Sequence, residues 1–469
     1  MNYRQIAALA LVAISAASVA SYYIYNSLLT TRPFNESGAY TEPAYNLYKY
    51  GQFVDFSSKG IFDMDKFTYW VPPLHSVFQL PFYILFGYGL WQIVAVQIAI
   101  LALTIVAIKK FSRFLKIAAI IPVTLLLTNR NFIVDSLVSR PDTLATLFGV
   151  LAILFTLKLQ KNKTNKSMKY VLLVGVSLGL SCLSYQLGAV YALSIGIYMF
   201  LEKQLKIFLK IIFVAVLTIL PYALYVAMSP QVFLQQSIGI YRINEVTSVK
   251  ELLQVELSRY IDFVFYAPAF ALLFLFALYK GLTQKNKGSE LRLLLITVIA
   301  ILVVLFVETH KISFQMILAM PFMTLLIALY VKDMRIVTIA ALVNFALVVT
   351  NIYLNLPTAQ NPSFLNFAQQ IDGKTNDTIL SYPTFFPVFR EKLFSIEAVK
   401  YERNLNGNVT LVEIIERVKP VLIVLEQQDV ANGQLPSNYK ISFNITRSQP
   451  SLYLSLGAID RSLVVYKRV

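Results

Sequence analysis

The sequence predicts a mostly α-helical membrane protein with about eleven transmembrane helices and a small C-terminal α/β domain. Two observations predict this fold class. Of the 469 residues, 57% are hydrophobic and only 14% are charged, whereas an ordinary soluble protein carries about 25% charged residues. Apolar runs long enough to cross about 30 Å of hydrocarbon also recur along the first three quarters of the chain.

The apolar runs predict the spans one by one. The first run follows Arg4 and is longer than the hydrophobic part of a signal peptide, so we expect a retained helix. The expected spans cover residues 5–30, 88–108, 117–129, 143–158, 170–187, 189–201, 207–228, 262–280, 293–307, 316–331 and 335–352.

Basic residues gather in alternate loops, which predicts the orientation. The loops rich in Lys and Arg lie at 109–116, 158–169, 203–210, 280–292 and 332–335, and the loops between them hold few. The positive-inside rule then places the N-terminus in the cytoplasm, and the first loop and the C-terminus outside. We expect a multi-pass protein of the bacterial plasma membrane, surrounded by lipids. The net charge of +16 follows from this topology and does not indicate a nucleic-acid partner.

The composition changes after about residue 352. Turn pairs such as Asp372-Gly373 appear, short β-type runs occur at 378–382, 421–426 and 463–466, and residues 411–418 have helical spacing. We therefore expect an extracytoplasmic domain at 353–469, next to a transmembrane domain at 1–352 that includes an interfacial loop at 31–87. The single cysteine, Cys182, excludes an internal disulfide and a cysteine-based metal site.

The first outer loop carries two candidate carboxylates. Glu36 and Glu42 lie among aromatic residues that include Tyr40, and the spacing from Pro43 onward predicts a helix that starts there. A carboxylate held against the bilayer beside aromatic rings is suited to chemistry. A solvated loop on the headgroups fits the same pattern.

Three further features face the same side. Pro72 and Pro73 exclude regular helix, and the run that follows from Leu74 is too short to span, so we expect it along the interface with His75. The other two features are the segment Ser139-Arg140-Pro141-Asp142-Thr143, with Asp135 shortly before it, and the segment Glu308-Thr309-His310-Lys311.

Each feature has an ordinary structural interpretation. Asp142 fits a helix N-terminus, where the macrodipole favours an acid, and Arg140 fits an interface anchor. Ionisable groups at membrane depth are nevertheless costly and tend to mark function. A buried carboxylate can act as a general base, and cations near it can bind a phosphate leaving group.

The order of these motifs resembles the membrane glycosyltransferases of the GT-C fold, near the bacterial aminoarabinose transferases and the protein O-mannosyltransferases. The motifs are E-x3-Y-x-E-x2-Y from Glu36, Pro-Pro-Leu followed by Phe-Gly, S-R-P-D-T-L from Ser139, the His310-Lys311 loop and a later Pro321. The resemblance covers about the first 330 residues. The family's acidic pair Asp-Glu reads Asn35-Glu36 here, and Val71 replaces the basic residue before Pro-Pro.

The resemblance implies an enzyme of the cell envelope that moves a hexosyl or pentosyl group, with inversion, from a polyprenyl-phosphate carrier to a lipid, glycan or protein on the outer face. It implies Glu36 as the general base, with Glu42 as second choice. It implies that Asp142 orients the acceptor or holds a divalent ion, Mg²⁺ or Mn²⁺. The residues implied in substrate binding are Tyr40, His75, Arg140, Arg259, His310 and Lys311.

Two alternatives stay open at this point. A transporter or flippase for a lipid or polysaccharide would also be polytopic, but such proteins often show internal repeats and ionisable residues in mid-span. This sequence shows no such repeat. The second alternative is a catalytically inactive relative that acts as an assembly partner, which Asn35 makes credible.

Overall fold

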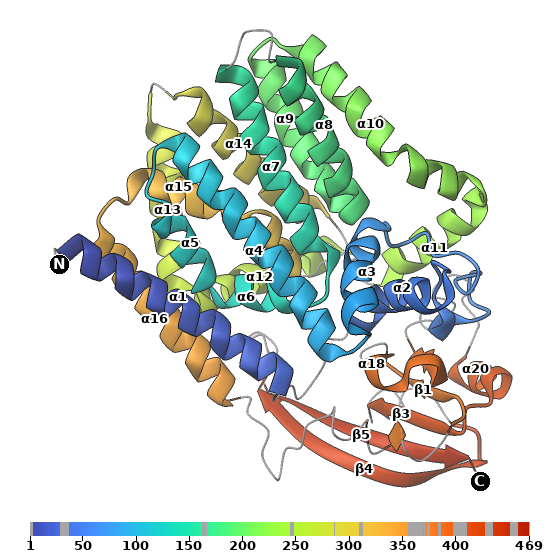
Figure 1. The fold of residues 1–469 in the computed structure, drawn as a ribbon. Helices are drawn as coiled ribbons and strands as arrows, with labels where there is room; N and C mark the ends of the chain where they lie inside the picture. The colour runs from blue at the N-terminus through green and yellow to red at the C-terminus, as the bar shows by residue number, and fades with distance from the viewer. Residues whose placement is uncertain are drawn as a thin grey trace.

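The computed structural model shows a helical bundle joined to a five-stranded sheet (Figure 1). The residues that the structure describes are 3–28, 37–161, 167–243, 248–285, 287–308, 313–354, 369, 371–372, 376–382, 386–396, 410–426, 435–450 and 458–468.

Helices form the bundle. Most of the expected apolar runs fall on a single helix, but the run 262–280 crosses from one helix into the next at a bend of 109°, and the run 316–331 starts in a 3-10 helix. The helices are α1 (Tyr3–Leu28), α2 (Ser37–Tyr50), α3 (Leu74–Phe86), α4 (Leu90–Leu115), α5 (Ile120–Leu127), α6 (Arg130–Leu137), α7 (Pro141–Lys161), α8 (Ser167–Ser184), α9 (Ala189–Leu201), α10 (Leu205–Ala227), α11 (Pro230–Ile243), α12 (Val249–Tyr266), α13 (Pro268–Thr283), α14 (Ser289–Val307), α15 (Met320–Tyr330) and α16 (Met334–Leu354). Short 3-10 helices are η1 (Phe56–Ser58), η2 (Gln186–Gly188) and η3 (Ser313–Leu318).

Several of these helices can cross a membrane. Among the described residues, five are long and apolar enough by themselves, and α12 with α13 makes a sixth candidate if the bent pair is one span. The five are α1, α4, α7, α10 and α14. The chain is therefore an integral membrane protein, and the number of eleven spans stays a prediction.

Helix α7 is the most buried of the five long apolar helices. Of its most apolar stretch, 78% is buried inside the protein, against 50% for α4 and α14. Gly149 on α7 makes room for Tyr191 of α9, because a Cβ at this position would lie 2.1 Å from the tyrosine ring. The hydroxyl of Tyr191 donates to the backbone oxygen of Leu318 at 2.9 Å. These contacts fix α7 against α9 and η3.

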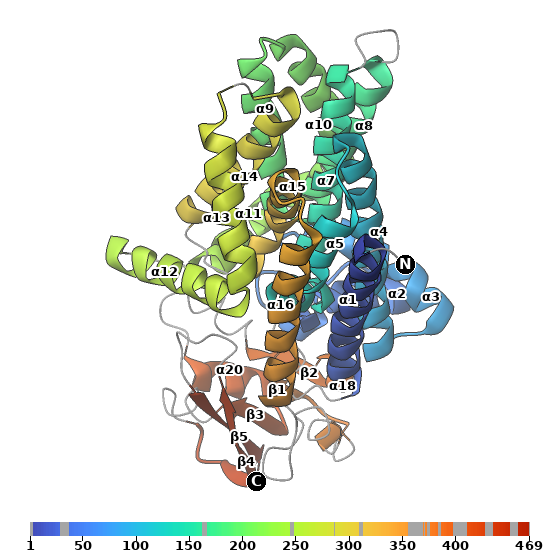
Figure 2. The same ribbon diagram turned by 90° about the vertical axis from the view of Figure 1, so that its left-hand side faces the viewer.

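Two glycines bring α8 and α10 close together. A Cβ at Gly175 would lie 2.5 Å from Val214, and a Cβ at Gly179 would lie 2.5 Å from Thr218. Small residues one helical turn apart are typical of closely packed membrane helices. Helices α1 and α16 also pack side by side (Figures 1 and 2).

The described residues of the predicted first outer loop (31–87) form α2, η1 and α3. The prediction that its helix begins at Pro43 was wrong, since α2 already begins at Ser37. Pro43 lies inside the helix and removes one backbone hydrogen bond, but Tyr40 and Thr41 in the preceding turn are buried. Their packing offsets that loss. Pro73 precedes α3, and the run from Leu74 that was expected to be too short to span forms this 13-residue helix.

The C-terminal residues form a sheet with the strand order β2-β1-β3-β5-β4. The strands β1 (Ile379–Ser381), β3 (Leu422–Glu426) and β5 (Ala458–Arg468) contain or lie within the three predicted runs, and β2 (Leu393–Ser395) and β4 (Tyr439–Pro450) were not predicted. Strand β1 is parallel to β2 and β3, whereas β5 is antiparallel to β3 and β4. The predicted helix is α20 (Leu411–Val418), which starts with a capping box at Thr410. The domain division at residue 352 stays a prediction.

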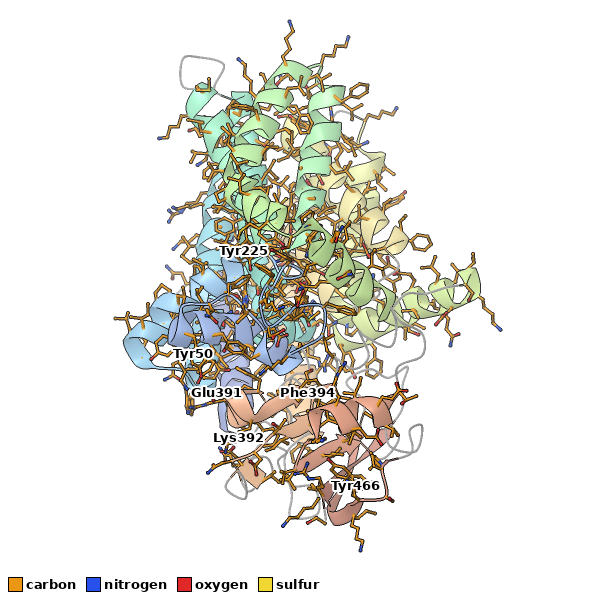
Figure 3. The ribbon with its side chains drawn as sticks, turned by 90° about the vertical axis from the view of Figure 1, so that its right-hand side faces the viewer. Tyr50, Tyr225, Glu391, Lys392, Phe394 and Tyr466 are labelled. Carbon is orange, nitrogen blue, oxygen red and sulfur yellow. The ribbon has the colours of Figure 1, made fainter. Side chains whose placement is uncertain are left out.

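Helix α2 is fastened to the sheet unit by one carboxylate. Oε1 of Glu391 accepts hydrogen bonds from the hydroxyls of Tyr45, at 2.6 Å, and Tyr50, at 2.9 Å, and it forms an ion pair with Lys49. Figure 3 shows Tyr50 and Glu391 where the bundle meets the sheet. We call these four residues the α2 junction. Helices α2 and α3 and the sheet thus lie at one end of the bundle, and α12 projects sideways near that end (Figure 2).

Candidate functional site

The start of α7 holds a buried ion pair. Pro141 is the first residue of the helix, and Oδ2 of Asp142 accepts a hydrogen bond from Nε of Arg140 at 2.8 Å. The side chains of Arg140 and Asp142 are only 1% and 2% exposed. Oδ1 of Asp142 has no hydrogen-bond partner within the described part of the chain. A buried carboxylate oxygen without a donor is costly, so a substrate hydroxyl would be a favourable partner for it. We call Arg140 and Asp142 the α7 pair.

Tyr40 brings the first outer loop to the α7 pair. The guanidinium carbon of Arg140 lies 5.6 Å from the centroid of the Tyr40 ring, and the ring of Trp70 lies 5.5 Å from the same centroid. A cation near an aromatic face is attracted by the ring quadrupole. Three of the residues predicted from the sequence, Tyr40, Arg140 and Asp142, therefore form one cluster.

His75 connects α3 to the same region through two glutamines. Its ring is fully buried, with Nδ1 3.0 Å from Nε2 of Gln79 and Nε2 3.3 Å from Nε2 of Gln97. The amide of Gln97 also lies 3.4 Å from the hydroxyl of Ser139 and 3.3 Å from that of Thr143. A polar chain thus runs from α3 across α4 to the start of α7.

The hydrogen bonds around Gln79 determine the tautomer of His75. The Gln79 oxygen accepts from the hydroxyl of Tyr83, and its nitrogen donates to the backbone oxygen of Tyr40. The nitrogen therefore also donates to Nδ1 of His75, so Nε2 carries the ring hydrogen. The side-chain oxygen of Gln97 accepts a hydrogen bond from this ring N–H when the amide turns its oxygen toward His75. Burial lowers the pKa of His75 to about 3, so the ring is neutral and orients Gln97.

Arg259 lies in a second polar group. It forms an ion pair with Glu256 at 3.0 Å, donates to a backbone oxygen of α14 at 3.2 Å and lies 3.5 Å from the side-chain oxygen of Gln315. Gln315 donates to the hydroxyl of Tyr185 at 3.3 Å. Tyr185 in turn interacts electrostatically with both members of the α7 pair. The sequence-predicted Arg259 is therefore connected to the α7 pair through Gln315 and Tyr185.

Glu42 is enclosed by the first outer loop. Its Oε1 accepts from the backbone N–H of Ser57 at 2.8 Å and lies 3.5 Å from Nδ2 of Asn46. Burial, and then the neighbouring carboxylate of Asp55, raise the pKa of Glu42 well above its usual value. Burial also raises the pKa of Asp55, which caps η1 by accepting from the N–H of Ser58. These contacts join α2 to η1, so the geometry favours a structural role for Glu42.

Three predicted site residues, Glu36, His310 and Lys311, lie outside the described residues. Sequence reasoning missed Gln79, Gln97, Tyr185 and Gln315 as members of the site. A signal was available for Gln97, because an amide in the middle of an apolar span is costly and calls for a partner. No comparable signal identifies the other three.

The contacts of Asp142 do not favour the predicted metal role. One of its oxygens is taken by Arg140, and a guanidinium beside the carboxylate repels a divalent cation. Among the described residues, no group of three His, Cys, Asp or Glu side chains has the spacing of a metal site. The Mg²⁺ or Mn²⁺ ion stays a prediction.

Part of the bundle matches a known protein family. Residues 71–228 match the family model described as dolichyl-phosphate-mannose-protein mannosyltransferase. This segment runs from the residue before Pro72 to the end of α10 and contains the α7 pair. No curated protein sequence matches the chain significantly.

Solved structures share the fold over nearly the whole chain. ArnT from Cupriavidus metallidurans bound to undecaprenyl phosphate aligns over 97% of this chain and 97% of its own, with a TM-score of 0.66 and 14% identity. The oligosaccharyltransferase of Archaeoglobus fulgidus in the apo form aligns over 89% of this chain and 69% of its own, with a TM-score of 0.57 and 12% identity. The resemblance to GT-C glycosyltransferases predicted from the sequence is confirmed at the level of the fold and of the partial family match.

Proposed function

We propose that this protein is an inverting glycosyltransferase that takes a hexosyl or pentosyl group from a polyprenyl-phosphate carrier. The observation that carries the proposal is the α7 pair, whose buried Asp142 keeps one oxygen without a donor among the described residues. The pair lies in a fold shared with ArnT, whose structure contains undecaprenyl phosphate. The acceptor is a lipid, a glycan or a protein on the outer face of the membrane.

In the proposed reaction the acceptor hydroxyl attacks the anomeric carbon as Glu36 removes its proton. The new bond joins the acceptor oxygen to that carbon, and the bond from the carbon to the phosphate oxygen breaks. Its electron pair leaves with the polyprenyl phosphate. Oδ1 of Asp142 accepts a hydrogen bond from the acceptor and so holds it for attack. Because phosphate departs readily as an anion, the step needs no general acid.

The surrounding residues act on charge and orientation. Arg259, Lys311 and His310 would offset the negative charge that grows on the phosphate, a strong effect in a site that excludes water. Neutral His75 holds Gln97 against the start of α7. Tyr40 covers the guanidinium of Arg140.

The proposed topology places this site on the outer side. We propose about eleven spans, a cytoplasmic N-terminus, and an outer C-terminal unit in a bacterial plasma membrane. In that arrangement the first outer loop and the sheet lie next to the acceptor, at the end of the bundle where Figure 1 shows them.

The experiment is sugar release from a panel of polyprenyl-phosphate sugars by purified protein in micelles. We expect wild type to release sugar from at least one donor and Glu36→Gln to be slower by about 100-fold or more. The matched control is Glu42→Gln, which keeps the hydrogen bond from Ser57 and should stay active. If wild type moved an intact lipid-linked sugar across a bilayer without cleaving it, the transporter would replace the transferase.

A further inference from the structure

Arg130, the first residue of α6, is a buried cation that the reaction above does not use. Its side chain is only 2% exposed. One terminal nitrogen, Nη1, donates to the side-chain oxygen of Asn131 at 3.0 Å. Nε and Nη2 have no hydrogen-bond partner within the described residues. Buried charged donors are costly when they lack an acceptor, so this pair of N–H groups needs an explanation.

The two unpartnered nitrogens lie on the same edge of the guanidinium. Nε–H and one Nη2–H point in parallel and form a fork, which fits two oxygens of one carboxylate or phosphate group. The guanidinium carbon of Arg130 lies 4.0 Å from the ring centroid of Tyr266. A ring over the face of a guanidinium does not occupy its in-plane N–H groups.

The position of Arg130 relates it to the proposed reaction centre. Asp135, on the same short helix, interacts electrostatically with both Arg130 and Asp142. Tyr266 and Arg259 lie seven residues apart on α12, so they share one face at a spacing of about 10 Å. Arg259 is already engaged by Glu256. Of the two arginines along this face, Arg130 is therefore the one whose fork can meet a ligand.

We propose that Arg130 binds two oxygens of the phosphate group of the lipid carrier through its Nε–H and Nη2–H fork. The proposal rests on the proposed function, and it names a phosphate-binding residue of that site. It explains why a guanidinium with an open fork is kept inside the protein, since the anion supplies the missing acceptors. The ring of Tyr266 holds the guanidinium in place for this contact.

The test measures binding without catalysis. Undecaprenyl phosphate is added to purified protein in micelles, and both its affinity and its effect on the thermal midpoint are recorded. We expect Arg130→Gln to weaken binding by about tenfold or more, because a charge-assisted bidentate contact is lost. Arg130→Lys keeps the charge but not the fork and should weaken it as well. The matched control is Arg335→Gln, since Arg335 lies over the ring of Tyr3 at 4.7 Å but is exposed.

A second readout separates ligand binding from a purely structural role. The thermal midpoint of Arg130→Gln without ligand is recorded separately, because the substitution also removes the electrostatic interaction with Asp135 and the contact with the ring of Tyr266. The proposal is overturned if the variant is less stable without ligand but undecaprenyl phosphate still raises its thermal midpoint by as much as it raises that of wild type. It is also overturned if phosphatidylglycerol protects wild type as well as undecaprenyl phosphate does, which would identify an ordinary bilayer phospholipid as the ligand.

The outcome for Arg130 is distinguishable from that of the proposed function. If wild type releases sugar and Arg130→Gln binds the carrier normally, only the role of Arg130 is rejected. If wild type neither binds the carrier nor releases sugar, the glycosyltransferase proposal itself is rejected, and the role of Arg130 with it.

Discussion

Replacing Asp142 by Asn tests whether the α7 pair serves catalysis or only the fold. Asparagine has the same shape but no charge, so Arg140 loses the carboxylate that it contacts at 2.8 Å. Removing one member of a buried ion pair costs about 3–5 kcal/mol. We expect the free energy of unfolding to fall by about 3 kcal/mol, the lower end of that range, because Arg140 keeps the ring of Tyr40 beside it. Misplacing the acceptor should slow sugar transfer by about 100-fold or more.

The double variant Arg140→Met with Asp142→Asn separates these two effects. Removing both charges of a buried pair is often nearly neutral, so its stability should return to within about 1 kcal/mol of wild type. Its activity should stay as low as that of the single variant, since the carboxylate is still absent. Unfolding of each variant in micelles and its rate of sugar release are measured side by side. If the double variant regained wild-type activity, the carboxylate would act only through the fold and the reasoning would fail.

Three further substitutions test other parts of the structure. Burial and Asp55 hold the pKa of Glu42 above its unfolded value of 4.5. Above pH 4.5 the folded protein therefore keeps a proton that the unfolded chain loses. The stability of the fold falls as the pH rises from 4.5 toward the folded pKa. Glu42→Gln should flatten that part of the stability profile, and an unchanged slope would contradict the burial argument. Gly149→Ala places a methyl group 2.1 Å from the ring of Tyr191 and should cost about 1–3 kcal/mol; a thermal midpoint equal to that of wild type would show that the two helices are not in contact. Glu391→Gln weakens the α2 junction and should cost about 0.5–1 kcal/mol of stability, because Lys49 and Glu391 are partly exposed; a thermal midpoint equal to that of wild type would mean that the junction does not stabilise the fold.

The sequence predicted the parts of this fold that depend on local pattern. Apolar length identified the long apolar helices such as α4 and α7, and Asp142 lies in the first turn of α7, as expected for an acid at a helix N-terminus. Strand β2 has only three residues, too few for a periodic pattern. Strand β4 carries the alternation Ile441, Phe443 and Ile445, so the sequence does contain a signal for this strand.

The site could be predicted only in part. Arg140 and Asp142 are two residues apart, and their segment was identified because charge at membrane depth is costly. The contact between His75 and Gln97 joins residues 22 positions apart on two different helices, which only the packing of α3 on α4 determines. The contact between Tyr185 and Gln315 likewise joins residues far apart in the sequence and follows only from the packing of the helices. Glu42 looked equivalent to Glu36 in the sequence, and its burial against η1 follows from the tertiary fold.

The most direct test of the account is the amount of polyprenyl phosphate formed from a lipid-linked sugar by wild type and by the Asp142→Asn variant at equal protein concentration. The account predicts steady formation by wild type and about a hundredfold less by the variant, with Glu42→Gln close to wild type. Equal product from wild type and Asp142→Asn would contradict it, because the buried carboxylate at the start of α7 would then have no part in the transfer.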